Sequence, residues 1–162
     1  MTLMTLQEFG TAMPTGEGRV LGLDIGTKTI GIALSDARRR IATPLETIRR
    51  VKKFADDATR LIDIFQEHAV IGLVSGHPLE MSGDEGPRAQ GNRQILSNIL
   101  AALARADCGD VPAMLWDERM SSTAVERTLI DEADMTRKRR REVIDRSAAA
   151  YILQGALDAL NG

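Results

Sequence analysis

Three acidic positions, far apart in the chain, are places where a carboxylate is either costly or chemically useful. Asp24 lies near the end of an otherwise apolar stretch, where its charge must be paired or must hold a cation to offset desolvation. The pair Asp117 and Glu118 follows a second apolar stretch, and Asp145 lies near the start of a C-terminal helical pattern. Carboxylates that converge repel one another unless a divalent cation neutralises them, and oxygen ligands favour Mg²⁺ or Mn²⁺ over zinc. The sequence therefore predicts a magnesium or manganese site.

Each of these acidic residues also has a structural explanation, which the sequence leaves open. Asp24 can cap the turn that follows it, and Asp145 can complement the dipole at a helix N-terminus. Neighbouring residues of a strand point to opposite faces, so only one of Asp117 and Glu118 can face Asp24. Periodicity does not decide which of them does so, and the other is then available to pair with Arg119.

Residues suited to binding phosphate occur near the carboxylates. Gly26-Thr27-Lys28 follows Asp24 closely and offers an open backbone and a hydroxyl group. Basic runs occur at 38–40, 49–53 and 137–141 although the net charge is −2. They indicate either a positively charged surface that binds nucleic acid or, equally well, solvated faces of helices and loops. Two cations about 4 Å apart can clamp the attacking and leaving oxygens of a phosphoryl transfer, with a water activated by the cation as nucleophile. Carboxylates beside basic runs therefore predict hydrolysis of phosphodiester bonds.

The elements that must position these residues alternate between strands and helices. Apolar runs predict strands, and apolar residues recurring every three to four positions predict amphipathic helices. The first two strands form a hairpin, and Pro44 places the third at an edge or start. The predicted fold is α/β, with a mixed central sheet opened by the β-hairpin and flanked by α-helices. The predicted strands cover 19–26, 29–35, 41–48, 69–76 and 111–116, and the predicted helices cover 51–68, 88–106 and 142–160, with a further helix opening at 121–124.

The chain is predicted to form one domain. No linker composition or repeat divides its 162 residues, which suffice for a substantial core. Residues 18–162 are predicted to form this domain, and residues 1–17, which lack clear periodicity, a flexible leader. The leader lacks the features of a signal peptide, and no stretch approaches the roughly 18 apolar residues of a membrane span. Cys108 is the only cysteine, so no internal disulfide can form, and a soluble cytoplasmic protein is predicted.

Four segments carry a resemblance to a known family. They are residues 21–33, 76–89, 117–124 and 144–154. In this order they are similar to motifs of the YqgF family, also called RuvX, of ribonuclease H-like proteins. The resemblance covers nearly everything after residue 18 and implies a ribonuclease H-like fold. The resemblance also implies a catalytic triad that binds Mg²⁺ or Mn²⁺ and consists of Asp24, Glu118 and Asp145. It thereby selects Glu118 over Asp117.

The second segment departs from the family pattern. The family usually has Gly-Leu-Pro-Leu there, with an aspartate after the methionine, whereas this chain has His77 and Ser82, and Asp84 lies two positions further on. An acidic role of this loop is therefore not predicted. His77 can be a metal ligand or, as we expect, a loop residue that shapes the substrate groove.

The predicted function is that of a nuclease acting on structured nucleic acid. The resemblance implies either maturation of the 5′ end of pre-16S rRNA in ribosome biogenesis or, alternatively, resolution of Holliday junctions in DNA recombination and repair. A resolvase would be a dimer because it makes two symmetric cuts, so both a monomer and a homodimer stay open. Aromatic residues make up 3% of the chain, which favours recognition of shape over stacking on bases. The residues predicted to hold substrate phosphates are Thr27, Lys28, Arg88, Arg119, Lys138 and Arg141.

Two further hypotheses belong to other classes of protein. A non-catalytic binding factor would keep the fold, but the presence of all three carboxylates argues against it. An ATP-handling protein of the actin and hexokinase type shares the Asp-Ile-Gly-Thr sequence at 24–27, but the chain is too short for two lobes.

Overall fold

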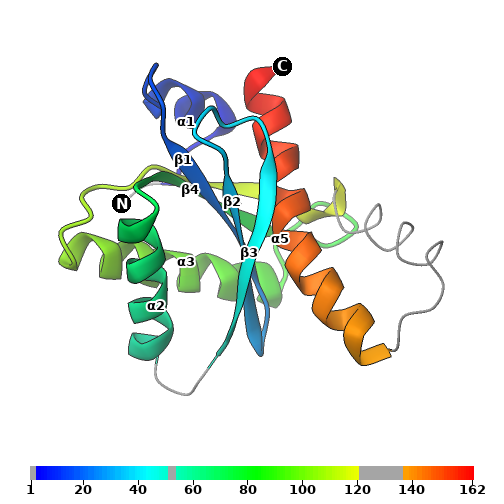
Figure 1. Ribbon diagram of the computed structural model, residues 1–162. Helices are drawn as coiled ribbons and strands as arrows, with labels where there is room; N and C mark the ends of the chain where they lie inside the picture. Colours follow the sequence, from blue (N-terminus) through cyan, green and yellow to red (C-terminus); the bar gives the residue numbers. More distant parts are fainter. Residues whose placement is uncertain (1–2, 51–53, 121–136) are drawn as a thin grey trace.

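A five-stranded mixed sheet forms the centre of the computed structural model, which describes residues 3–50, 54–120 and 137–162 (Figure 1). At 54–56, 120 and 137–147 it describes the backbone alone. The strands are β1 (Arg19–Ile25), β2 (Thr29–Ser35), β3 (Ala42–Arg49), β4 (Val70–His77) and β5 (Ala113–Asp117). The helices are α1 (Leu6–Ala12), α2 (Phe54–Glu67), α3 (Pro87–Arg105) and α5 (Arg137–Asn161), and a 3₁₀ turn covers Glu118–Met120.

The strands lie in the order β3-β2-β1-β4-β5. The pairs β1–β2 and β2–β3 are antiparallel, whereas β1–β4 and β4–β5 are parallel. This arrangement confirms the predicted mixed sheet opened by a hairpin. Pro44 lies on the edge strand β3, beside a register shift opposite Ile32 and Ala33, where its missing N–H interrupts no central ladder.

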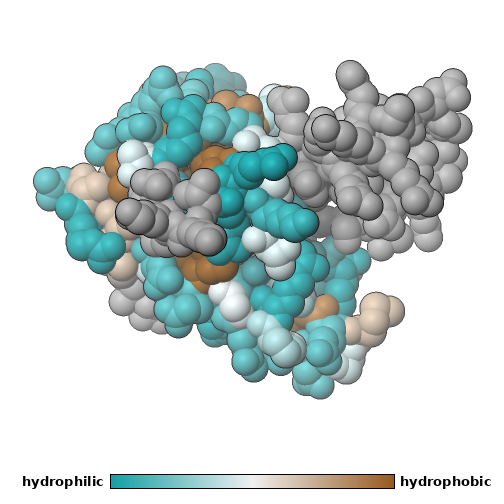
Figure 2. Space-filling view, turned by 90° about the horizontal axis from the view of Figure 1, so that it is seen from below, coloured by the Kyte–Doolittle hydropathy of each residue, from teal (hydrophilic) through white to brown (hydrophobic). Residues whose placement is uncertain are grey.

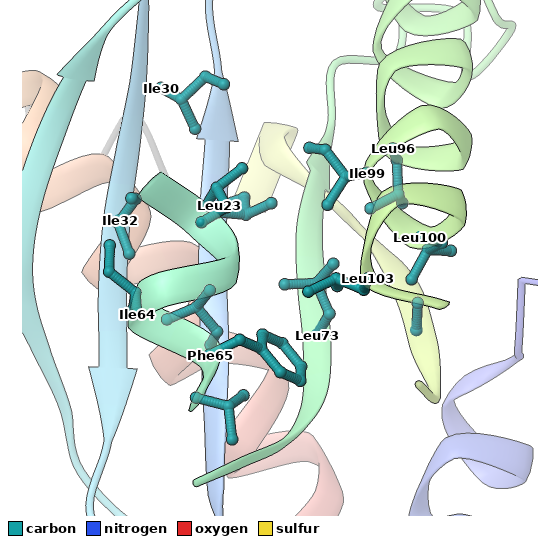
Figure 3. Packing of buried hydrophobic residues seen from close by; sticks show 14 of the residues in the cluster. Leu23, Ile30, Ile32, Ile64, Phe65, Leu73, Leu96, Ile99, Leu100 and Leu103 are labelled. Atoms are coloured by element: carbon teal, nitrogen blue, oxygen red, sulfur yellow. The ribbon is translucent and has the colours of Figure 1, made fainter. Parts of the chain in front are cut away.

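Alternation along β1 divides its side chains between two cores. Leu21, Leu23 and Ile25 belong to the core on the side of α2 and α3 (Figure 3). Val20 belongs to the core beneath α5, and Gly22 and Asp24 lie on the same face of β1 as Val20. Figure 1 shows α5 on one side of the sheet and α2 with α3 on the other. The residues of α2, β4 and α3 that pack in the first core include Ile64, Phe65, Leu73, Leu96, Ile99, Leu100 and Leu103.

Gly22 allows α5 to approach the middle of the sheet closely. A Cβ atom added at Gly22 would lie 2.7 Å from Leu153 Cβ and 3.2 Å from the carbonyl oxygen of Ala149. The helix presents the small buried side chains of residues 148–150 in this region. Both atoms opposite Gly22 belong to or adjoin the helix backbone, so neither can move aside cheaply. The position of α5 over β1 therefore depends on the absence of a side chain here.

We expect Gly22→Ala to lower the free energy of unfolding by about 2 kcal/mol, because the added methyl group overpacks the contact between β1 and α5. Urea unfolding followed by circular dichroism measures this change. Gly91→Ala is a matched control in the exposed part of α3, where a Cβ would meet nothing within 4 Å. That control should gain about 0.5–1 kcal/mol from helix propensity. Equal stabilities of the two variants would contradict the proposed close contact.

The N-terminal segment differs from the flexible leader that the sequence predicts. Thr5 and Glu8 form a reciprocal capping box at the start of α1. Phe9 is fully buried in the core beneath α5. The N–H of Met4 donates to the carbonyl oxygen of Ala113 at 2.8 Å, which adds a short parallel bridge to the outer edge of β5. A seven-residue helix with one buried side chain leaves no periodic pattern for sequence reasoning to detect.

The helices within the described ranges are all too short or too polar to cross a membrane.

Candidate active site

Asp24 is held near the C-terminal end of β1, on the face that α5 covers. It is half-buried and pairs across the hairpin with Gly31. The buried Asn92 of α3 donates from Nδ2 to the carbonyl oxygen of Ile25 at 3.1 Å. The N–H of Gly26 donates to the carbonyl oxygen of Thr29 at 2.8 Å and closes the turn. These bonds fix the end of the strand immediately beside the carboxylate.

Glu118 reaches the same face from the end of β5. Met114 belongs to the core beneath α5, and Glu118 shares its parity at the start of the 3₁₀ turn. The Glu118 carboxyl group lies against Gly76 of β4, where an added Cβ would be 2.9 Å from Glu118 Cδ. The side chains of Glu118 and Asp24 lie close enough for the charge of Asp24 to act on Glu118. The structure thus brings together two of the three predicted carboxylates, from strands that are separated by β4.

The proximity of the two carboxyl groups perturbs their protonation. Burial and the nearby charge of Asp24 raise the pKa of Glu118 to about 7. The positive charge of Arg88 acts in the opposite direction and lowers the pKa of Glu118. Burial and repulsion between the two carboxylates therefore favour protonation of Glu118 as long as no cation neutralises the pair.

Asp117 points to the opposite side of the sheet from Glu118. It pairs in register with His77 of β4 and accepts hydrogen bonds from Arg119 Nε and Nη2 at 2.6–3.0 Å. The bonded guanidinium of Arg119 lowers the pKa of Asp117. The alternation of strand residues therefore resolves the choice that the sequence leaves open, with Asp117 in a salt bridge and Glu118 beside Asp24. Arg119, predicted to hold phosphate, has Asp117 as its partner.

Position 145 lies on the turn of α5 that precedes Ala149. Gln154, further along α5, donates to the carbonyl oxygen of Arg40 and accepts from the N–H of Ala42, at the end of the sheet opposite Asp24. The helix therefore runs antiparallel to β1, and its first half lies toward the end of β1 that carries Asp24. The side chains of Asp145, Lys138 and Arg141 lie outside the described residues, so their predicted roles stay predictions.

A basic cavity of about 860 Å³ adjoins the turn after β1. It is lined by turn residues 26–29 together with Arg49, Arg50 and Arg88. Three residues that the sequence predicts to hold phosphate, Thr27, Lys28 and Arg88, therefore share one cavity. The two arginines from the end of β3 are absent from the predicted set. Their position follows from the pairing of β2 with β3, which places Arg49 opposite Thr29. This pairing between strands is not visible in the sequence.

His77 belongs to a different network from the carboxylate pair. Its Nε2 lies 2.8 Å from Glu85 Oε1, and Glu85 also forms an ion pair with Arg93 of α3. Both partners lower the pKa of Glu85, His77 more strongly. The network ties the loop after β4 to α3, in line with the expected role of His77 in shaping the loop. Within the described ranges, no three potential ligands gather into a metal site around His77 or elsewhere.

The donor set at the site fits a hard divalent cation. Asp24 and Glu118 supply carboxylate oxygens, and the raised pKa of Glu118 reflects burial and the repulsion between these two groups, which a cation would relieve. Arg88 and the basic cavity lie beside the pair and suit an anionic substrate. Such a site can bind a phosphate ester and a cation together.

The sequence matches a known family model and known relatives along nearly its whole length. Residues 18–159 match the family model described as "RuvX: Holliday junction resolvase". A protein of Rhodospirillum rubrum named "Putative pre-16S rRNA nuclease" is 53% identical over 161 residues, which cover 99% of this chain and 95% of the relative. A relative of the same name from Paramagnetospirillum magneticum is 54% identical over 144 residues, covering 89% and 88% of the two chains.

Two solved structures resemble the fold at low sequence identity. One is Thermus thermophilus RuvC in complex with a Holliday junction substrate, with a TM-score of 0.56 and 16% identity over 90% of this chain and 96% of the other. The second is the yeast mitochondrial Holliday junction resolvase Ydc2, with a TM-score of 0.51 and 15% identity over 96% and 85% of the two chains. Together with the mixed sheet these likenesses confirm the predicted ribonuclease H-like fold.

Proposed function

Because the chain belongs to the RuvX family, we propose that it is a metal-dependent nuclease that hydrolyses phosphodiester bonds in structured nucleic acid. The observation that carries this proposal is the proximity of Asp24 and Glu118 beside a basic cavity. The preferred substrate is the precursor of 16S rRNA, cut at its 5′ end, since relatives about 50% identical carry that name. On this reading the protein works in the cytoplasm during ribosome biogenesis.

Asp24 and Glu118 would hold Mg²⁺ or Mn²⁺, and Asp145 would complete the ligand set. When bound, such a cation supplies positive charge that lowers the pKa of a coordinated water and stabilises the charge developing on the phosphate. The residues of the chain then have distinct tasks. Asp24 and Glu118 stay ionised in the loaded site, Arg88 orients the phosphate beside them, and Gly76 keeps the space for the Glu118 carboxyl group. Thr27 and Lys28 contribute donors from the turn.

Resolution of Holliday junctions is the second candidate. The description of the matching family model and the ribonuclease H-like fold shared with two resolvases support it. Two symmetric cuts require two active sites, so this activity further requires a homodimer.

One experiment separates these candidates. The full chain is incubated with a pre-16S rRNA fragment bearing its 5′ extension and with a four-way DNA junction, each with EDTA, Mg²⁺ or Mn²⁺, while light scattering records its oligomeric state. We expect cleavage of the RNA only with a cation and no cutting of the junction. Paired cuts in the junction by a dimer would support the second candidate. Absence of hydrolysis of both substrates under all three conditions would contradict a nuclease and favour a binding factor.

A further inference from the structure

The basic cavity beside the carboxylates is preorganised by backbone hydrogen bonds. The N–H of Arg50 donates to the carbonyl oxygen of Lys28 at 2.8 Å, and Arg50 Nη1 donates to the carbonyl oxygen of Gly26 at 2.8 Å. Arg50 therefore braces the turn between β1 and β2 from the end of β3. Its neighbour Arg49 lies opposite Thr29 in the ladder, at the exposed margin of the cavity.

The chemistry of the lining residues identifies the kind of ligand. In the described part of the chain, the side chains that line the cavity are those of lysine, arginine and threonine residues, and Gly26 also lines it. Among the described residues that line it, none is acidic, aromatic or aliphatic, so they offer no stacking surface for a base and no carboxylate to neutralise the charge. The ion pairs found in the described part of the chain involve other side chains than Lys28, Arg49 and Arg88. A cluster of donors of this kind suits a phosphate of a nucleic acid backbone.

Arg88 connects this cavity to the carboxylate pair. It is the second residue of α3 and lines the cavity, and its charge also acts on Glu118. Figure 2 looks onto this end of the molecule and shows strongly hydrophilic side chains gathered across the middle of the face. A strand whose scissile phosphate lies at Asp24 and Glu118 therefore has the cavity directly beside it.

We infer that this cavity is a subsite for a non-scissile phosphate of the substrate strand, next to the phosphate that is cut, and that Arg49 binds it from the margin while Arg50 braces the turn. The inference rests on the proposed nuclease function for the position of the cut, but the binding of a backbone phosphate is measurable without cleavage. Arg49 is thereby assigned as a substrate-binding residue and Arg50 as a positioning residue.

The test compares Arg49→Gln with Arg105→Gln, each in full-length protein. Arg105 is an equally exposed arginine in the last turn of α3, about 25 Å along the helix from Arg88 and outside the cavity. Binding of a fluorescein-labelled pre-16S rRNA fragment and of a labelled four-way DNA junction is followed by anisotropy in EDTA, between 50 and 300 mM KCl. We expect Arg49→Gln to raise Kd roughly tenfold and to lower the slope of log K against log salt by about 0.7–0.9. Arg105→Gln should match the wild type.

Single methylphosphonates, which lack the charge of one phosphate, then locate the contact along the DNA strand. One uncharged linkage beside the cut should weaken binding by the wild type and have no further effect on Arg49→Gln. The subsite would be overturned if Arg49→Gln had the same Kd and salt slope as the wild type. It would also be overturned if the wild type bound neither probe at 50 mM KCl. If the wild type cleaves normally and Arg49→Gln binds as well as the wild type, the proposed function stands and the subsite is refuted. If binding depends on Arg49 but no cleavage occurs, the subsite stands and the proposed function is refuted.

Discussion

Asp24→Asn and Glu118→Gln are each expected to reduce the rate of cleavage in Mg²⁺ by about a thousandfold or more while the fold persists. Each substitution removes the charge of one proposed cation ligand but keeps the size and the hydrogen-bonding capacity of the side chain. Cation assistance contributes several kcal/mol of transition-state stabilisation, and each 1.36 kcal/mol corresponds to a factor of about ten. Single-turnover cleavage of the pre-16S rRNA fragment measures the loss, and circular dichroism checks the fold.

Asp117→Asn is the matched control for this prediction. Asp117 is adjacent to Glu118 and is also a carboxylate at the end of β5, but it lies on the opposite side of the sheet in a salt bridge with Arg119. Cleavage by Asp117→Asn should stay within a few fold of the wild type. A loss as large as that of Glu118→Gln, or undiminished cleavage by Asp24→Asn, would show that the catalytic centre is elsewhere.

In the absence of divalent cations, the stability of the protein is expected to fall as the pH rises through 7. The pKa of Glu118 is raised from 4.5 to about 7 in the folded protein by burial and by Asp24. The proton on Glu118 therefore contributes stability that is fully present below pH 4.5 and is lost as the pH rises through 7. A shift of this size corresponds to up to about 3 kcal/mol. Glu118→Gln mimics the protonated group and should keep that stability at pH 8.

Urea unfolding in EDTA between pH 4 and pH 9 measures this effect as the difference between the wild type and Glu118→Gln. Titrating groups that do not interact with Glu118 cancel in the difference, which should grow with pH and level off above pH 8. Saturating Mg²⁺ at pH 8 should stabilise the wild type more than the variant, because the cation binds the ionised pair. A difference that does not depend on pH would contradict the raised pKa of Glu118.

Most of the fold was predictable from the sequence because the strands and the longer helices have strong local signals. Apolar runs bounded by glycines identify β1 and β4, and Pro44 identifies an edge strand. Helix α1 was missed because its stability comes from a capping box and from the burial of Phe9, neither of which makes a periodic pattern.

The candidate site was predictable only in part. Asp24 stands out because it interrupts an apolar strand, but the choice between Asp117 and Glu118 depended on the family resemblance. Local periodicity cannot make that choice, since it does not show which face of β5 meets β1 across β4. The sequence shows Arg49 only as a member of a basic run, because its place beside Thr29 follows from the pairing of β2 with β3.

The main-chain bond from Met4 to Ala113 has a consequence for the behaviour of the protein at high concentration. It occupies part of the outer edge of β5, the strand that ends the parallel side of the sheet. Unpaired edges of this kind recruit strands from other molecules and start aggregation. Residues 3–12 thus protect this edge against self-association, and a truncated chain that begins at residue 18 should aggregate more readily although Asp24 and Glu118 are untouched.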